Sequence, residues 1–192
     1  MSENDTDVIA NVDLTDDEYE VIGGLIRRRW RVNDADGDLI LRAKQKLLRA
    51  KEEFPFTTDD GELVFQVKAE GILDVSGDYV LTEGSDGDNI AVLTKDFTLL
   101  KHVWHINGPD GEEEWAVIES RSAVFQFVRG IHRVLSFVPH KYTIETPEGE
   151  SIGTMEGKLA LKDKYDITIE DSKDIPKEAL VASAIAVDAL EN

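Results

Sequence analysis

A unit of 28 residues occurs three times in this chain, and this repeat limits the possible folds more than any other feature of the sequence. The copies occupy residues 29–56, 79–106 and 142–169. In each copy an aromatic strand precedes an acidic, glycine-containing turn at Gly37, Gly87 or Gly149, and a short apolar strand follows. Asp-Gly and Glu-Gly turns between such segments are typical of β-hairpins. The repeat therefore predicts a mainly antiparallel β fold.

A further hairpin follows each of the first two copies, over residues 57–70 and 107–122. Each unit then has about four antiparallel strands, and three units give roughly eleven or twelve. An open sheet of that size would leave two unpaired edges, whereas a closed barrel has none. We therefore expect a single domain over residues 19–192, built as a closed antiparallel barrel of about twelve strands.

Two segments depart from the β pattern. Apolar residues recur at helical spacing over residues 122–138, which predicts a short amphipathic helix. Residues 175–190 predict a second helix, with Asp174 as its cap and Pro176 in the first turn, and its stretch 179–187 is apolar on every side and rich in alanine. A helix that is apolar all round is buried, and this one is too short to span a membrane. We expect it to run through the centre of the barrel.

The N-terminal region is acidic, with eight acidic residues and no Lys or Arg among residues 1–20. We expect residues 1–18 to form a flexible tail. Thr15 and Glu18 have the spacing of a helix capping box, whereas Tyr19 and Val21 would share one face of a strand. We favour the strand, because the glycine pair that follows at 23–24 would break a helix.

The chain carries a formal net charge of −19, from 40 acidic and 21 basic residues. Such a chain repels phosphate backbones, which excludes a general nucleic-acid binder. Dispersed carboxylates keep a surface hydrated in molar salt, so the charge favours a high-salt cytoplasm, as in a haloarchaeon. An ordinary acidic protein is the alternative. No apolar run is long enough to span a bilayer and no signal peptide is recognisable, so we expect a cytoplasmic protein.

Searches for catalytic and metal-binding patterns find no nucleophile elbow, zincin, Walker A or dinucleotide-binding motif, and the chain has no cysteine. Asp34, Asp36 and Asp38 lack the glycine and glutamate positions of a calcium-binding loop, so we read them as a hairpin turn. We assign no metal or catalytic role to the four histidines and expect no cofactor. The tryptophans at 30, 104 and 115 are expected in the barrel core or at its rim.

Basic residues are concentrated in one part of the chain. Residues 27–51 contain nine basic and three acidic side chains, a local balance of +6. Strand alternation places Arg27, Arg29 and Arg31 on one face, and Arg42 and Lys44 on one face of the next strand, with Lys46 near its end. If these strands form a hairpin, the six side chains converge into a candidate anion-binding site. The alternative is that each pairs with a carboxylate on a neighbouring strand.

The hairpin repeat, the KEEFPF stretch at 51–56, the H-K-Y-x-I pattern at 140–144 and the alanine-rich final helix together resemble the LURP-one-related (LOR) family. That family is similar in fold to the tubby C-terminal domain and to phospholipid scramblases. The resemblance covers roughly residues 19–192, and it implies a twelve-stranded barrel around a central C-terminal helix. Tubby domains bind phosphoinositide headgroups, and scramblases have a lipid connection.

Pattern and resemblance together lead to three readings of function. The favoured one is a non-enzymatic binding or scaffold protein that recognises an anionic lipid headgroup or a phosphate-bearing ligand, peripherally at a membrane surface and without spanning it. The second is a scaffold for a protein partner, docked on a barrel face or on the 122–138 helix. The third and least favoured is a hydrolase with an unrecognised site.

Overall fold

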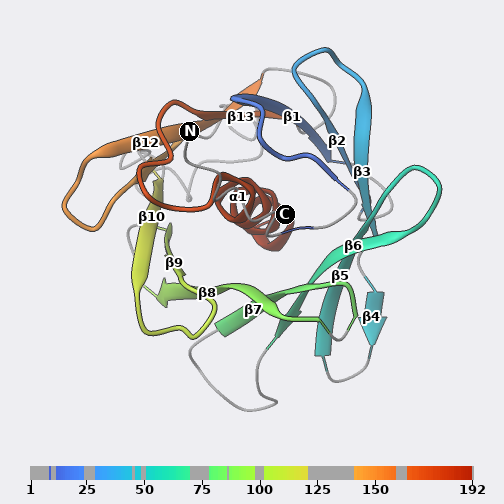
Figure 1. Ribbon diagram of the computed structural model, residues 1–192, viewed down its shortest axis with the longest axis horizontal. Coiled ribbons are helices and arrows are strands. Elements are labelled where there is room, and N and C mark those ends of the chain that lie inside the picture. The colour runs from blue at the N-terminus through green and yellow to red at the C-terminus, as the bar shows by residue number, and fades with distance from the viewer. Residues whose placement is uncertain are drawn as a thin grey trace, which may run out of the picture.

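The computed structural model describes residues 9, 12–23, 29–44, 46–48, 51–69, 78–85, 87–97, 102–120, 141–158 and 164–191. It contains thirteen strand segments and one helix, arranged as a ring of strands around the helix (Figure 1). The strands are β1 (Glu18–Gly23), β2 (Arg29–Asn33), β3 (Leu39–Lys44), β4 (Lys46–Leu48), β5 (Lys51–Thr57), β6 (Leu63–Ala69), β7 (Asp78–Glu83), β8 (Asn89–Phe97), β9 (His102–Asn107), β10 (Glu114–Ser120), β11 (Lys141–Glu145), β12 (Ser151–Lys158) and β13 (Lys164–Ile169).

The sheet closes on itself at β5. All neighbouring strands are antiparallel, in the order β3-β2-β1-β13-β12-β11-β10-β9-β8-β7-β6-β5-β4. Both β3 and β4 pair with β5 in one register, Ala43 opposite Phe56 and Leu47 opposite Glu52, so they count as two parts of one strand on either side of residue 45, which lies outside the described residues. The thirteen segments therefore make a closed twelve-stranded barrel, which confirms the predicted fold.

Each repeat copy supplies three consecutive strands. The first copy supplies β2 to β5, with β3 and β4 counted as one strand, the second supplies β7 to β9, and the third supplies β11 to β13. The fourth strand is β6 after the first copy and β10 after the second. After the third copy that place is taken by β1, which pairs with both β13 and β2. The predicted strand near Tyr19 is therefore present. Gly37 and Gly149 occupy hairpin turns with φ of 88° and 87°, a conformation that glycine adopts without steric cost.

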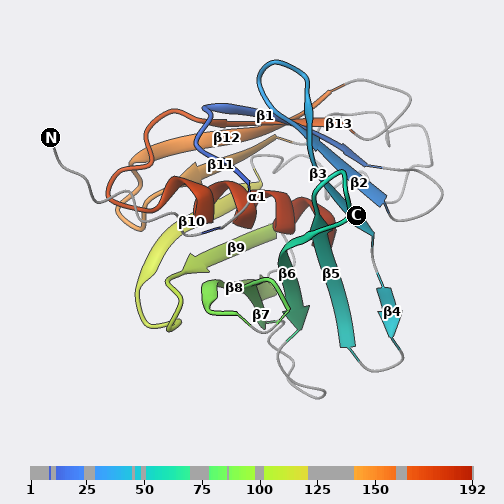
Figure 2. The same ribbon diagram turned by 45° about the vertical axis from the view of Figure 1, so that its right-hand side comes forward.

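The helix α1 (Lys177–Glu191) runs through the ring of strands (Figure 2). It begins two residues later than predicted, and the carbonyl of Pro176 accepts the N–H of Leu180 at 3.2 Å. Every residue from Glu178 to Ala189 is buried. Five of these are alanines, whose small side chains let the helix pack between large inward-facing residues such as Trp104, Phe54 and Phe65. The central-helix prediction is confirmed.

Part of the segment expected as a tail contributes to the core. Ile9 and Leu14 are buried, and the backbone N–H of Ile9 donates to the carboxylate of Glu178 at 3.0 Å. Lys177 forms an ion pair with Asp17, beside the start of α1. These contacts attach the chain before β1 to the first turn of the helix. The flexible tail stays an expectation for residues 1–8, and both those residues and the 122–138 helix lie outside the described residues.

Candidate functional site

The basic residues predicted as a site lie on β2 and β3. Trp30 and Val32 of β2, and Leu41 and Ala43 of β3, point inward and are buried. The alternation of a strand turns the residues between them outward, and all four of those are exposed: Arg29, Arg31, Arg42 and Lys44. Antiparallel pairing sets Arg29 opposite Lys44 and Arg31 opposite Arg42. The two predicted rows therefore meet on the outer surface as a cluster, here called the β2–β3 cluster.

Ion pairing reaches only part of this cluster. Arg42 forms an ion pair with Asp59, in the turn between β5 and β6. Within the part of the chain that the structure describes, Arg29, Arg31 and Lys44 make no ion pair. Of the two remaining candidates, Lys46 lies in β4 without a described side chain, and Arg27 lies outside the described residues.

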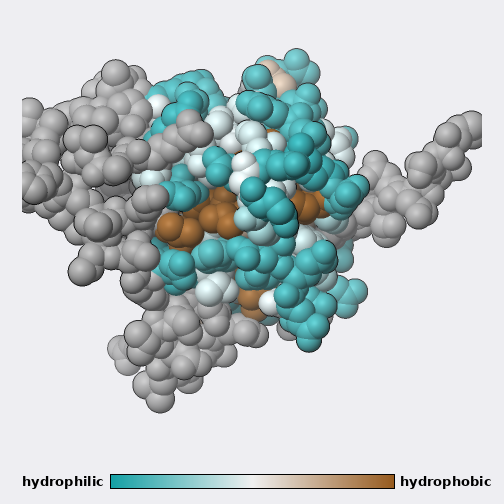
Figure 3. Space-filling view, turned by 90° about the vertical axis from the view of Figure 1, so that its left-hand side faces the viewer, coloured by the Kyte–Doolittle hydropathy of each residue, from teal (hydrophilic) through white to brown (hydrophobic). Residues whose placement is uncertain are grey.

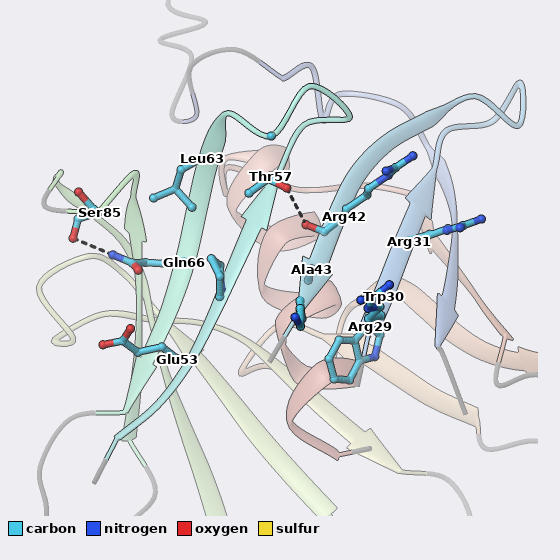
Figure 4. A pocket seen from close by; sticks show the side chains of 13 residues that line it. Arg29, Trp30, Arg31, Arg42, Ala43, Glu53, Thr57, Leu63, Gln66 and Ser85 are labelled. Atoms are coloured by element: carbon cyan, nitrogen blue, oxygen red, sulfur yellow. Dashed lines mark hydrogen bonds between the residues drawn. The ribbon is translucent and has the colours of Figure 1, made fainter. Parts of the chain in front are cut away.

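A groove of about 700 Å³ lies beside the β2–β3 cluster. It crosses the strands from β2 to β6 and reaches the turn after β7 (Figure 4). Its lining residues are Arg29, Trp30, Arg31, Arg42, Ala43, Lys44, Glu53, Pro55, Thr57, Gly61, Leu63, Gln66 and Ser85.

The far end of the groove is formed by β6 and the turn after β7. The N–H of Gly84 donates to the carbonyl of Val64 at 2.9 Å, which holds this turn against β6. The carbonyl of Ser85 accepts the amide of Gln66 at 2.7 Å and the ammonium of Lys68 at 2.5 Å. Gln66 is consequently buried although it lies on the outer face of its strand. The groove therefore has a cationic end at β2–β3 and a polar end at β6.

A second pair of cations on the outer surface is arranged differently. Lys158 of β12 lies opposite Lys164 of β13. Lys164 bonds to Glu20 at 2.9 Å, and Lys158 contacts Asp166 at 2.7 Å and Glu20 at 3.7 Å. The hydrogen bond from Lys164 is the main reason that the pKa of Glu20 falls below its usual value. The hydrogen bond to Asp166 raises the pKa of Lys158. We call these four residues the β12–β13 cluster.

The other residues singled out in the sequence lie in a turn or in the barrel core. Asp34 accepts the N–H groups of Asp36 and Asp38 at 3.1 and 2.8 Å, as expected for a hairpin turn. Trp30 and Trp104 belong to the core, and Trp115 packs partly buried against it. Among the described residues no cluster of His, Asp and Glu has the arrangement of a metal site.

Only one histidine side chain is placed within the described residues. His105 lies between Glu114 at 2.6 Å and Asp96 at 3.2 Å. Its partial burial acts to lower its pKa, but the hydrogen bonds to Glu114 and Asp96 outweigh that effect and raise the pKa. These contacts hold the ring between two carboxylates on the outer surface of β8–β10 and account for its position.

The face shown in Figure 3 is mostly hydrophilic over the described residues, with a small hydrophobic strip near its centre. In the described part of the chain, no helix has the length and apolar character needed to cross a membrane.

Among the groove residues that were not predicted, four have polar side chains: Glu53, Thr57, Gln66 and Ser85. Glu53 and Thr57 share the outer face of β5. Strand alternation would have placed both beside the groove if the order of the strands in the sheet had been known. Gln66 and Ser85 meet because the turn after β7 leans onto β6, and no local pattern encodes that contact. Asp59 falls in the DDG turn of the hairpin predicted over residues 57–70.

The closed twelve-stranded barrel and the enclosed helix define a β-barrel of the tubby-like class. The chain belongs to the LURP-one-related family, whose model matches residues 39–188. It is similar in structure to a protein from Arabidopsis thaliana solved by X-ray crystallography, with a TM-score of 0.56 and 12% identity over 94% of this chain and 98% of that chain. The comparison with curated proteins found no match.

Proposed function

We propose that this protein is a non-enzymatic binding module that holds a phosphate-bearing anion at the β2–β3 cluster. The observation that carries the proposal is the set of three cations without an ion pair among the described residues, Arg29, Arg31 and Lys44, in a chain of net charge −19. Like charges directly opposite on neighbouring strands destabilise a sheet. An anionic ligand would relieve that repulsion.

The chemistry of the side chains suits phosphate. The guanidinium groups of Arg29 and Arg31 offer forked donors that match two phosphate oxygens, and Lys44 adds a point charge. Arg42 is exposed and paired with an exposed Asp59, and a pair of that kind contributes little stability. A phosphate can therefore compete for Arg42 as a fourth donor. A lipid headgroup and a soluble phosphate compound share this chemistry.

The test compares the wild-type protein with the double variant Arg29→Gln/Arg42→Gln. Binding of inorganic phosphate and of vesicles containing anionic phospholipid is measured at low and at molar KCl. We expect the variant to lose at least about tenfold in affinity, since two charge-assisted contacts are removed, while its thermal midpoint stays unchanged. The matched control, Lys141→Gln/Lys173→Gln, makes the same charge change elsewhere on the surface and should bind like the wild type.

The two probes separate the sources of the ligand. Binding to vesicles but not to inorganic phosphate indicates a lipid headgroup and a peripheral position at the membrane surface. Binding to inorganic phosphate alone indicates a soluble ligand. The proposal is wrong if the wild-type protein binds neither at either salt concentration, or if the double variant loses stability rather than binding.

A further inference from the structure

The groove carries charge of both signs, and the two signs do not pair with each other. Figure 4 shows Arg31 and Arg42 at one end, and Glu53, Gln66 and Ser85 at the other, with Thr57 between them. Glu53 lines the polar end from the outer face of β5 and is half-buried. Among the described residues it makes no ion pair.

Glu53 has a lysine opposite it on each neighbouring strand. On β4 this is Lys46, whose side chain lies outside the described part of the structure. On β6 it is Lys68, whose ammonium donates to the carbonyl of Ser85. The amide nitrogen of Gln66 donates to the same carbonyl, which leaves the side-chain oxygen of Gln66 as an acceptor. The polar end therefore offers a carboxylate and an amide oxygen, both acceptors. A ligand group that meets them must be a donor, and a cationic donor meets the carboxylate best.

We infer that the groove takes an aminoalkyl phosphate, with the phosphate at the β2–β3 cluster and the ammonium group at Glu53 and Gln66. This inference rests on the proposed function, because it assumes a phosphate at the cationic end. The groove volume of about 700 Å³ lies within the range of small-molecule sites. A ligand with a second anion in place of the ammonium meets Glu53 as a like charge and is disfavoured.

The probes are phosphoethanolamine and glycerol phosphate, which carry the same phosphate but end in an ammonium or a hydroxyl. Their affinities for the full chain are measured by calorimetry at low ionic strength. We expect the wild-type protein to prefer phosphoethanolamine about threefold to fivefold, the range of one partly exposed ion pair. In Glu53→Gln this preference should fall to about one, because the ammonium loses its carboxylate.

The control variant Glu170→Gln removes the same charge from an exposed residue that does not line the groove, and it should keep the wild-type preference. Circular dichroism verifies the fold of each variant, and Glu53→Ala provides a second substitution at the same position. Vesicles of phosphatidylethanolamine, compared with the soluble headgroup, distinguish a lipid from a free aminoalkyl phosphate.

Equal affinity for the two probes in the wild-type protein overturns this inference and leaves the proposed function intact. A preference that survives Glu53→Gln overturns the role of Glu53 in the same way. If neither phosphate binds, the proposed function fails and the inference fails with it. A preference that disappears only in the Glu53 variants supports both.

Discussion

The β2–β3 and β12–β13 clusters begin from the same arrangement and end in different ones. Each places two cations opposite each other on the outer surface, Arg31 with Arg42 in one and Lys158 with Lys164 in the other. In the second, Glu20 contacts both lysines and Asp166 contacts Lys158. In the first, the one ion pair among the described residues joins Arg42 to Asp59.

The difference shows that cations in an acidic protein are not neutralised automatically. The β12–β13 lysines lie near strand β1, which contributes the outward carboxylate of Glu20. Glu20 is paired with Asp166 of β13, and this register brings its carboxylate to both lysines. The corresponding neighbour of β3 is β5, and its outward residues beside β3 include Pro55 and Thr57, which carry no charge. One cluster is a set of salt bridges. In the other, Arg29, Arg31 and Lys44 make no ion pair with any residue that the structure describes.

Both clusters depend on the interior of the barrel, so the largest effect should come from Ile185→Asp. Ile185 is fully buried in the middle of α1, and a carboxylate there has no partner or must take up a proton. We expect this variant not to fold, as measured by circular dichroism and solubility. A soluble Ile185→Asp protein with a native spectrum would show that the helix does not hold the strands. The positions of the two clusters would then not depend on the packing around α1.

Potassium chloride should act in opposite directions on the overall charge repulsion and on the salt bridges of the β12–β13 cluster. At a net charge of −19 the compact state repels itself, and screening relieves that repulsion. We predict that the thermal midpoint rises steeply from low to molar KCl, although the same salt weakens the bridges of the β12–β13 cluster. Differential scanning calorimetry measures the curve. A flat or falling curve would contradict the adaptation to a high-salt cytoplasm.

Glu20→Gln removes the carboxylate that both lysines share. Because contacts with Lys164 hold the pKa of Glu20 below its usual value, its stabilisation is present above the ordinary carboxyl pKa and is lost as the pH falls through the lowered pKa. We expect a loss of about 1 kcal/mol at neutral pH, with the two proteins converging in acid. Urea unfolding at several pH values measures this difference. A constant difference across the titration would show that the carboxylate acts through packing and not through charge.

Arg31→Glu should convert the β2–β3 cluster into a copy of the β12–β13 cluster. The new carboxylate lies opposite Arg42 and close to Arg29 and Lys44, so attraction replaces repulsion. We expect the free energy of unfolding to rise by about 0.5 kcal/mol while phosphate binding is lost. Arg31→Gln, which only removes the repulsion, should give a smaller gain. If Arg31→Glu is destabilising, Arg31 has a structural partner, and the contrast between the clusters is wrong.

The sequence allowed most of the fold to be predicted because its signals are periodic. Hairpin turns recur in all three copies, and the continuous apolar surface of residues 179–187 could only be buried. The strand alternation also placed Arg29, Arg31, Arg42 and Lys44 on shared faces. These features need only the period of a strand or helix and the identity of turn residues.

The groove could not be predicted because it depends on relations between separate elements. The groove is lined by residues of β2, β3, β5 and β6 and by the turns at Gly61 and Ser85, and no local pattern shows that these elements meet at one place. The contact of Ser85 with Gln66 joins residues 19 positions apart through a turn. The burial of Ile9 and Leu14 was also not predicted, because the acidic residues around them are typical of an exposed tail.

The position of α1 in chain order has a consequence for synthesis. All thirteen strand segments emerge from the ribosome before the helix that fills their interior. The ring also closes late, because β1 pairs with β13 and joins Glu18 to Thr168. Until α1 follows, the inward faces of the strands have nothing to pack against, so the nascent chain exposes apolar surface for most of its translation. Production of this protein should therefore be more sensitive to chaperone supply and elongation rate than its final stability suggests.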